Sequence, residues 1–290
     1  MLHIQNQIGI LKSLIAGAAG RFLGWAGKLL PSKPSVIRLK CGAKWLAIND
    51  YLSLFLRFCL PFEEAEQAFL MKYLRNGWTI LDIGAHHGFY TLLFSQNAGG
   101  EGRVIAFEPS ERERKRLAEH LALNECRNVT VEPVALGDRE GQAELYICDG
   151  VETGCNSLRA PLVFEKTTSV RVPVSTLDQY GLSHSLGRID FIKLDVEGAE
   201  LSVLKGGLNV LGGSDAPVMM VEIVDRRTMD WGYASRDVLA LLKNLRYALF
   251  SFCRNGLLKP LQDKTEYNEN ILAVPAGRMA EVEPFLSPPR

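Results

Sequence analysis

Short apolar runs alternate with longer amphipathic segments along most of the chain. From residue 63 onward, the apolar runs predict buried strands and the segments with helical spacing predict helices. The strands are expected at 79–83, 103–107, 128–134, 188–194, 218–223, 247–252 and 270–274. The helices are expected at 63–75, 90–97, 110–124, 199–205 and 235–245. This order predicts an α/β fold with a doubly wound, mainly parallel sheet, helices on both faces and an antiparallel edge hairpin made by the last two strands.

The beginning of the chain has a different pattern. Between residues 4 and 29, apolar side chains recur at steps of three and four, which predicts an N-terminal amphipathic helix that ends at Pro31. Three uses remain open for this helix: it packs on the body, it pairs with a second helix, or it lies on an anionic membrane with Phe22 and Trp25 in the interface. Two short strands around Gly42 predict a hairpin, and the apolar residues 51–60 are compatible with either helix or strand.

These patterns divide the chain into four parts. We expect a helical arm at 1–35, an accessory hairpin and apolar segment at 36–62, the main domain at 63–276 and a tail at 277–290. Within the main domain, residues 149–169 interrupt the alternation with glycines and a proline, and long loops of this kind are commonly functional.

The net charge of zero hides an asymmetry. Of the 33 basic and 33 acidic residues, eight basic residues and one acidic residue lie in residues 1–60, so this part carries +7 and the rest −7. The basic arm is therefore a candidate for contact with an anionic membrane. The acidic body argues against a protein that coats nucleic acid. The six cysteines show no metal-ligand spacing, which favours a reducing compartment, and we expect a cytoplasmic protein with no metal, in contact with the inner membrane surface if the arm binds there.

Candidate chemistry lies where the predicted strands end. Gly84 and Gly88 follow the first strand with the spacing G-x-x-x-G, which allows a tight turn and a close backbone approach to a ligand at a helix N-terminus. The next strand runs into Glu108, which could accept hydrogen bonds from both hydroxyls of a ribose. Together they indicate a cofactor that contains a nucleoside.

A second group of polar residues follows the strand at 188–194. Asp195, Glu197 and Glu200 crowd the end of this strand, and Lys193 lies within it. Glu222 is a further acid inside an apolar strand. Acids that lie so close must be hydrogen-bonded, paired with a cation or shifted in pKa.

Five motifs occur in matching order over residues 61–275: D-x-G-A-x-x-G-x-x-T at 82–91, F-E-P at 107–109, V-A-L-G-D at 134–138, S-T-L-D at 175–178 and I-K-L-D-V-E-G-A-E at 192–200. In these motifs the chain resembles the FkbM-type family of S-adenosylmethionine-dependent methyltransferases. The resemblance implies a class I, Rossmann-like methyltransferase fold, S-adenosylmethionine as the cofactor and methyl transfer to oxygen. The implied acceptor is a small-molecule or glycan hydroxyl: that of a sugar, of a glycolipid or polysaccharide precursor, or of a secondary metabolite.

The resemblance also implies a cofactor site. Its expected residues are Asp82, Gly84, Ala85, His86, Gly88, Thr91, Glu108, Leu136, Gly137 and Asp138. The glycine turn would hold the methionine part, Glu108 the ribose, and residues 136–138 the adenine. At position 86 the family usually has Asn or another small polar residue, so His86 departs from the pattern.

Methyl transfer to a neutral hydroxyl needs a base. Our candidates for this catalytic role are Asp195, Glu222 and His86, in that order. We expect the segment 149–169 to cover the acceptor site, with Asn156, Ser157 and Glu197 in contact with the substrate. Two alternatives remain: a non-catalytic cofactor-binding scaffold at a membrane complex, and a nucleotide-dependent oxidoreductase. The chain has neither of the motifs that would support an oxidoreductase, G-x-G-x-x-G and Tyr-x-x-x-Lys.

Overall fold

The computed structural model describes residues 34–48, 50–149, 153–160 and 166–288. The predicted helix at 4–29, and with it the choice between its three uses, lies outside these ranges. Within them, no helix combines the length and the apolarity needed to cross a bilayer.

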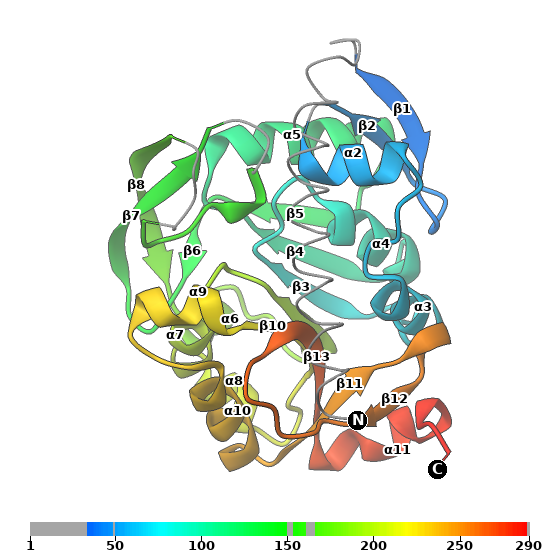
Figure 1. Cartoon of the computed structure of the whole chain (residues 1–290), viewed down its shortest axis with the longest axis vertical. Helices are drawn as coiled ribbons and strands as arrows, with labels where there is room; N and C mark the ends of the chain where they lie inside the picture. Colours follow the sequence, from blue (N-terminus) through cyan, green and yellow to red (C-terminus); the bar gives the residue numbers. More distant parts are fainter. Residues whose placement is uncertain (1–33, 49, 150–152, 161–165, 289–290) are drawn as a thin grey trace.

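A central sheet of eight strands forms the middle layer (Figure 1). Its order is β5-β4-β3-β9-β10-β13-β11-β12. The bounds are β3 Thr79–Ile83, β4 Arg103–Phe107, β5 Val129–Glu132, β9 Phe191–Leu194, β10 Val218–Val224, β11 Tyr247–Phe252, β12 Leu258–Pro260 and β13 Asn268–Pro275. The strands β5, β4, β3, β9 and β10 are parallel, and β13 is antiparallel to both β10 and β11. The mainly parallel sheet is thus confirmed. The expected antiparallel pair also forms, but it is not at the edge, because β12 lies outside β11.

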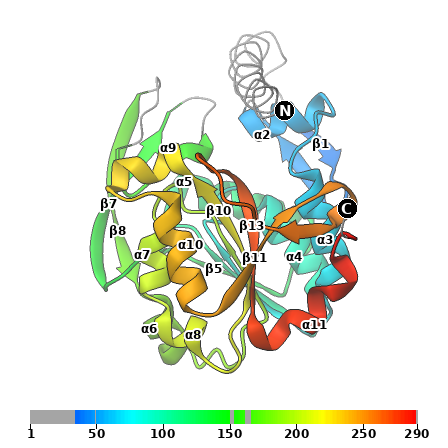
Figure 2. The same ribbon diagram turned by 60° about the horizontal axis from the view of Figure 1, so that its bottom comes forward.

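Helices cover both faces of this sheet, as Figure 2 shows for α3 and α4 on one side and α7 and α10 on the other. The first face carries α3 Glu64–Tyr73, α4 Phe89–Ala98 and α5 Glu111–Leu123. The second carries α6 Leu177–Ser183, α7 Glu200–Lys205, α8 Leu208–Gly212 and α10 Ser235–Asn244. Neighbouring strand residues face opposite layers, so that Ile80 packs with α3 and α4 while Leu81 packs with the second group. This is the doubly wound fold that the sequence predicts.

The hairpin expected around Gly42 is present. Strands β1 Ser35–Arg38 and β2 Lys44–Ala47 pair antiparallel, and they are followed by α2 Tyr51–Arg57. The segment 51–60, which the pattern left open, is therefore helical over most of its length. Helix α2 begins after Asp50, whose side chain accepts the backbone N–H of Ser53 at 2.8 Å.

A second, three-stranded sheet was not predicted. It has the order β6-β8-β7, with β6 Ala135–Leu136, β7 Gly141–Cys148 and β8 Thr167–Ser175. The predicted loop at 149–169 is accordingly the connection of a β7–β8 hairpin, and its last residues belong to β8. The short helix η1 Thr153–Cys155 lies in this connection.

The remaining elements are short. They are α9 Asp225–Thr228, η2 Met229–Trp231, η3 Arg254–Gly256, η4 Ala276–Arg278, α11 Met279–Val282 and η5 Glu283–Phe285. The last of them pack on α3, where the rings of Phe285 and Phe69 lie 4.9 Å apart. The chain beyond β13 therefore helps to cover the first face of the sheet.

Candidate active site

The glycine turn lies between the ends of three neighbouring strands. Gly84 and Gly88 both have φ of +88°, a region that side chains other than glycine rarely adopt. The N–H groups of Gly84 and Ala85 donate to the carbonyl of Phe107 at the end of β4, each at 3.0 Å. On the other side, a Cβ at residue 84 would come within 1.8 Å of the carbonyl oxygen of Asp195. The turn is thus packed between β4 and the acidic turn that follows β9.

Asp82 lies beneath this turn and has an unused hydrogen-bond acceptor. The residue is 1% exposed, and Thr91 Oγ1 donates to its Oδ2 at 2.5 Å. Its Oδ1 is buried and has no partner among the described residues. Burial raises the pKa of Asp82, and the nearby ammonium of Lys193 opposes this shift. A buried acceptor without a donor fits the ammonium group of a bound aminoacyl moiety.

Glu108 lies beside the same turn, at the end of β4. Its Oε2 accepts the N–H of His86 and its Oε1 accepts the N–H of Ser110, both at 2.8 Å. Burial raises the pKa of Glu108 to about 7. Each carboxylate oxygen can accept a second hydrogen bond. These two oxygens therefore fit the two hydroxyls of a ribose, so the residues around the turn suit a nucleoside cofactor with a methionine part.

Three acids and two cations gather at the adjacent edge of the sheet. Carboxylate oxygens of Asp195, Glu197 and Glu222, here called the acid trio, all lie within 4.8 Å of one another. Lys193 Nζ lies 2.8 Å from Asp195 Oδ2. Arg227 Nε lies 2.6 Å from Glu197 Oε2, and the same guanidinium pairs with Glu222. Oxygen ligands of this kind also suit divalent cations, but Arg227 already binds two of the three carboxylates.

The three carboxyl groups differ in proton affinity. Burial raises the pKa of Glu222 well above its ordinary value, and it raises the pKa of Glu197 to about 8. Burial also acts on Asp195, but the cations Lys193 and Arg227 outweigh it and lower the pKa of this residue. Glu197 and Glu222 are therefore the two members of the acid trio that hold a proton most readily. The sequence predicts that Asp195, Glu197 and Glu200 crowd the end of one strand and marks Glu222 as a further acid. The structure brings Glu222 to Asp195 and Glu197, whereas Glu200 accepts the N–H groups of Val196 and Gly198.

A further polar group lies beside the acid trio and was missed by sequence reasoning. Lys193 Nζ is 4.9 Å from the centre of the Tyr90 ring, and Tyr90 donates to Glu63. Glu63 Oε1 also accepts from Asn270 Nδ2 at 2.9 Å, and Asn270 pairs with Glu222 across β13 and β10. Glu63 has φ of +42°, an unusual conformation for a residue with a side chain. Only the sheet order, which the sequence did not give, brings Glu63 and Asn270 together.

The described part of the β7–β8 connection bridges the two turns. His86 Nε2 lies 3.1 Å from Thr153 Oγ1. Ser157, which is 4% exposed, donates through Oγ to the carbonyl of Glu197 at 2.9 Å. Asn156 Oδ1 instead accepts the N–H of Cys148 at 2.9 Å. The segment expected to cover the acceptor site thus contacts both the glycine turn and the acidic turn, although Asn156 and Ser157 are held by the chain itself.

Residues 136–138, which the resemblance assigns to the adenine, contact β8 and α7. Leu136 packs in the core of the second face, and a Cβ on Gly206 at the end of α7 would come within 1.9 Å of the carbonyl of Gly137. The N–H of Asp138 binds Ser202 Oγ at 3.0 Å. The contacts of these three residues are with β8 and α7, so their expected role at an adenine stays a prediction.

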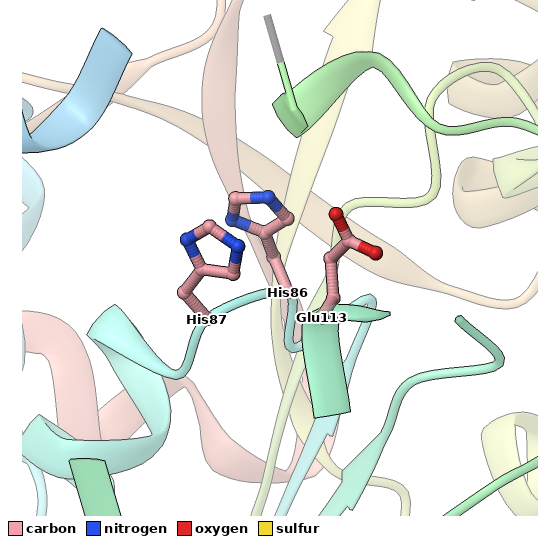
Figure 3. A group of neighbouring side chains, drawn as sticks. All are labelled: His86, His87 and Glu113. Carbon is pink, nitrogen blue, oxygen red and sulfur yellow. The ribbon is translucent and has the colours of Figure 1, made fainter. Parts of the chain in front are cut away.

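Two histidines of the turn meet an acid from the start of α5 (Figure 3). The rings of His86 and His87 stack with their centres 3.8 Å apart and their planes 21° apart. Imidazole binds a metal through lone pairs in the ring plane, and the lone pairs of stacked rings do not converge on one point. Glu113 is also occupied, because it pairs with Arg112 and accepts from Ser110. In these orientations the three side chains form a packed cluster, and Glu113 is bound within the chain.

Comparison with known proteins agrees with this geometry. The family model described as "Methyltransferase FkbM domain" matches residues 82–249, which include the glycine turn, Glu108 and the whole acid trio. A curated relative, "Methyltransferase 1" of Beauveria bassiana (strain ARSEF 2860), is 26% identical over 147 residues. This match covers 44% of the chain and 57% of the relative, so the chain spans little more than half of that protein.

Among solved structures, similar chains include an O-methyltransferase from Bacillus cereus in complex with SAH (TM-score 0.44, 15% identity, 77% of this chain and 87% of the other). An SAM-dependent O-methyltransferase from Thermotoga maritima has a TM-score of 0.41 at 13% identity, with 83% and 78% covered. An rRNA methylase from Streptococcus thermophilus has a TM-score of 0.36 at 14% identity, with 72% and 91% covered.

Proposed function

The chain belongs to the FkbM methyltransferase domain family, and from this premise we propose that it transfers a methyl group to a hydroxyl oxygen. S-adenosylmethionine is the cofactor. The proposed acceptor is a hydroxyl of a sugar, of a glycolipid or polysaccharide precursor, or of a secondary metabolite. One observation carries the choice of oxygen as the acceptor atom. The acid trio, which can take a proton from a hydroxyl, lies directly beside the turn that suits the cofactor.

The close contact between Gly84 and the carbonyl of Asp195 brings the glycine turn and the acid trio together. S-adenosylmethionine supplies an electrophilic methyl group on a sulfonium. The protein has to align the acceptor oxygen with that methyl group and remove the hydroxyl proton as the new bond forms, and alignment alone can contribute several kcal/mol. In this scheme Asp82 holds the amino group of the methionine part, and Glu108 holds the ribose.

The acid trio takes the proton. The sequence favours Asp195 as the base, but its pairing with Lys193 lowers its pKa and makes it a weak base. Glu222 has a raised pKa and hence the higher proton affinity. We therefore assign the proton to Glu222, with Asp195 as its neighbour. His86 becomes a less favoured candidate, because burial lowers its pKa and Thr153 lies against its ring.

The connection between β7 and β8 is proposed as the cover of the acceptor site. Its contacts to His86 and Glu197 support this role, because they span the space between the two turns. Deletion of residues 151–166 should lower turnover and change the preference among acceptors. Unchanged activity and preference in this deletion would contradict the cover.

The acceptor is proposed to be a small molecule or a glycan and not a nucleic acid. The net charge of −7 on residues 61–290 would repel a phosphate backbone. For the cellular location we propose the cytoplasm, with residues 4–29 in contact with the inner membrane surface, which the charge of +7 on residues 1–60 supports.

Two measurements test the function together. Calorimetry determines whether S-adenosylmethionine binds, and a methyl-release assay over a panel of hydroxylated acceptors determines whether it is used. Binding with turnover on a hydroxyl supports the proposal. Binding without turnover on any acceptor favours a cofactor-binding scaffold, and no binding overturns both.

A further inference from the structure

The glycine turn is held from below by helix α5. His120 Nδ1 lies 2.7 Å from the backbone carbonyl of His87, inside the turn. A carbonyl only accepts, so Nδ1 carries a proton and donates it. One helical turn earlier, Leu117 packs under Gly88 so closely that a Cβ there would come within 2.3 Å of Leu117 Cδ1. The same face of α5 thus contacts the turn at two points.

This hydrogen bond fixes one peptide plane of the turn. The carbonyl of His87 and the N–H of Gly88 belong to the same planar peptide group. The N–H of Gly88 donates to the carbonyl of Ala85 at 2.8 Å, and the carbonyl of His87 accepts from His120. With both ends held, the plane cannot rotate. The neighbouring N–H of His86, which binds Glu108, is oriented by the same chain segment.

The ring of His120 is in turn held by the β1–β2 hairpin. Trp45 is fully buried and stacks on His120, with ring centres 3.9 Å apart and planes 20° apart. The Trp45 ring is also fixed at its edge by a 3.0 Å hydrogen bond from Nε1 to Ser53 Oγ. The hairpin itself is bound to α5, because Arg116 Nη2 donates to the carbonyl of Leu46 at 2.9 Å.

Trp45 and the hairpin lie outside the residues 82–249 that the family model matches. We propose that Trp45 and His120 are positioning residues for the cofactor: the hairpin holds the His120 ring, and His120 holds the glycine turn in the shape that binds S-adenosylmethionine. This inference rests on the proposed function for its ligand, but the geometry of the turn can be tested without any ligand.

Two substitutions, His120→Leu and His120→Asn, separate the hydrogen bond that His120 donates from the space that its side chain fills. Leu fills the space and removes the donor, which leaves the His87 carbonyl buried without a partner. The side-chain amide of Asn can donate from nearly the same place as Nδ1. Leaving one buried acceptor unpaired should weaken S-adenosylmethionine binding about tenfold. Trp45→Leu, which removes the stacked ring, should weaken binding in the same direction, whereas Trp45→Phe keeps a ring there and should bind nearly as the wild type does.

The control is Leu242→Ala, a cavity in α10 on the opposite face of the sheet, where Leu242 is fully buried. It should lower the melting temperature without affecting the turn. The first readout is hydrogen exchange of residues 84–90 in the cofactor-free full chain, and the second is the dissociation constant of S-adenosylmethionine by calorimetry.

In His120→Leu we expect faster hydrogen exchange at residues 84–90 and about tenfold weaker binding of S-adenosylmethionine. His120→Asn should restore both the exchange rates and the affinity nearly to the wild-type values. Leu242→Ala should keep the wild-type exchange rates and affinity. Unchanged exchange in His120→Leu overturns the proposal, and so does an equal loss of binding in Leu242→Ala, because general destabilisation would then explain the effect. If the wild type binds no S-adenosylmethionine, the proposed function fails, while the exchange result still decides whether His120 positions the turn.

Discussion

Gly84 lies against the carbonyl oxygen of Asp195, so that a Cβ at residue 84 would come within 1.8 Å of it. This contact joins the turn that suits the cofactor to the turn that carries the acid trio. It also explains why residue 84 has to be glycine on two grounds, the left-handed backbone and the lack of space.

Gly84→Ala should therefore destabilise the protein and abolish cofactor binding. A backbone carbonyl cannot move away as the end of a flexible side chain can, and we expect a loss of about 3 kcal/mol or more in the free energy of unfolding. Urea unfolding measures this loss. Gly100→Ala is the matched control, since a Cβ there meets nothing within 4 Å, and it should differ little from the wild type. A stable Gly84→Ala that still binds S-adenosylmethionine would contradict the packing of the turn.

Cofactor affinity should depend on pH through Glu108. Burial raises the pKa of this carboxyl group to about 7, from an ordinary value of 4.5, so it is mainly protonated below pH 7. Ribose hydroxyls donate to the ionised form, so binding releases a proton in this range and affinity should rise with pH until about 7. Because of the same shift, Glu108 binds more protons in the cofactor-free fold than in the unfolded chain between about pH 4.5 and 7. The contribution of Glu108 to the free energy of unfolding therefore falls as pH rises through this range.

Calorimetry at several pH values tests this dependence. Glu108→Gln should bind more weakly and show a flatter profile, because the amide does not titrate. If the variant keeps the pH dependence of the wild type, Glu108 is not its source.

Turnover should depend on the acid trio in a different way. Burial raises the pKa of Glu197 to about 8 and that of Glu222 well above its ordinary range, so the form that accepts a proton becomes more populated as pH rises. We expect kcat to increase with pH up to at least about 8. Glu222→Gln should lower kcat by about 10²–10⁴-fold and leave the affinity for S-adenosylmethionine unchanged.

Asp195→Asn serves as the comparison. It removes the partner of the buried Lys193, so it should cost stability as well as activity. A Glu222→Gln enzyme with wild-type kcat would remove Glu222 from the mechanism.

The basic beginning of the chain should bring the protein to anionic vesicles. The charge of +7 in residues 1–60 and the apolar spacing at 4–29 predict that the full chain floats with such vesicles in a density gradient and that the fraction bound falls with salt. The chain of residues 36–290 should remain in solution. Equal partitioning of the two chains would exclude the arm as the membrane contact.

Much of the fold could be predicted because strands and helices of the main domain have clear periods. The runs that end at Ile83, Phe107 and Leu194 are mostly apolar, and their strands are buried in the central sheet apart from Arg103. Strand β8 was missed although Val170, Val172 and Val174 alternate along it; most of its residues are exposed, and Val172 is its one buried residue. Its partner β7 is buried only in its second half, at Leu145, Ile147 and Cys148.

The site was predictable only where its residues are close in sequence. Asp195 and Glu197 share one motif, and Glu222 is conspicuous as an acid in an apolar strand. Arg227 and Glu63 gave no such signal. Arg227 reaches the acid trio from the helix that follows β10, and Glu63 reaches Asn270 only because β13 lies next to β10. Contacts of this kind depend on strand order, which a single sequence does not fix.

The most direct test of the proposed function is transfer of an isotope-labelled methyl group from S-adenosylmethionine into a cell extract, followed by identification of the labelled product. The account predicts label on a hydroxyl oxygen of a small molecule or glycan, with one S-adenosylhomocysteine formed for each methyl group transferred, and loss of this label with Glu222→Gln. Label on nitrogen, carbon or nucleic acid would contradict it, as would an extract in which the protein produces no S-adenosylhomocysteine.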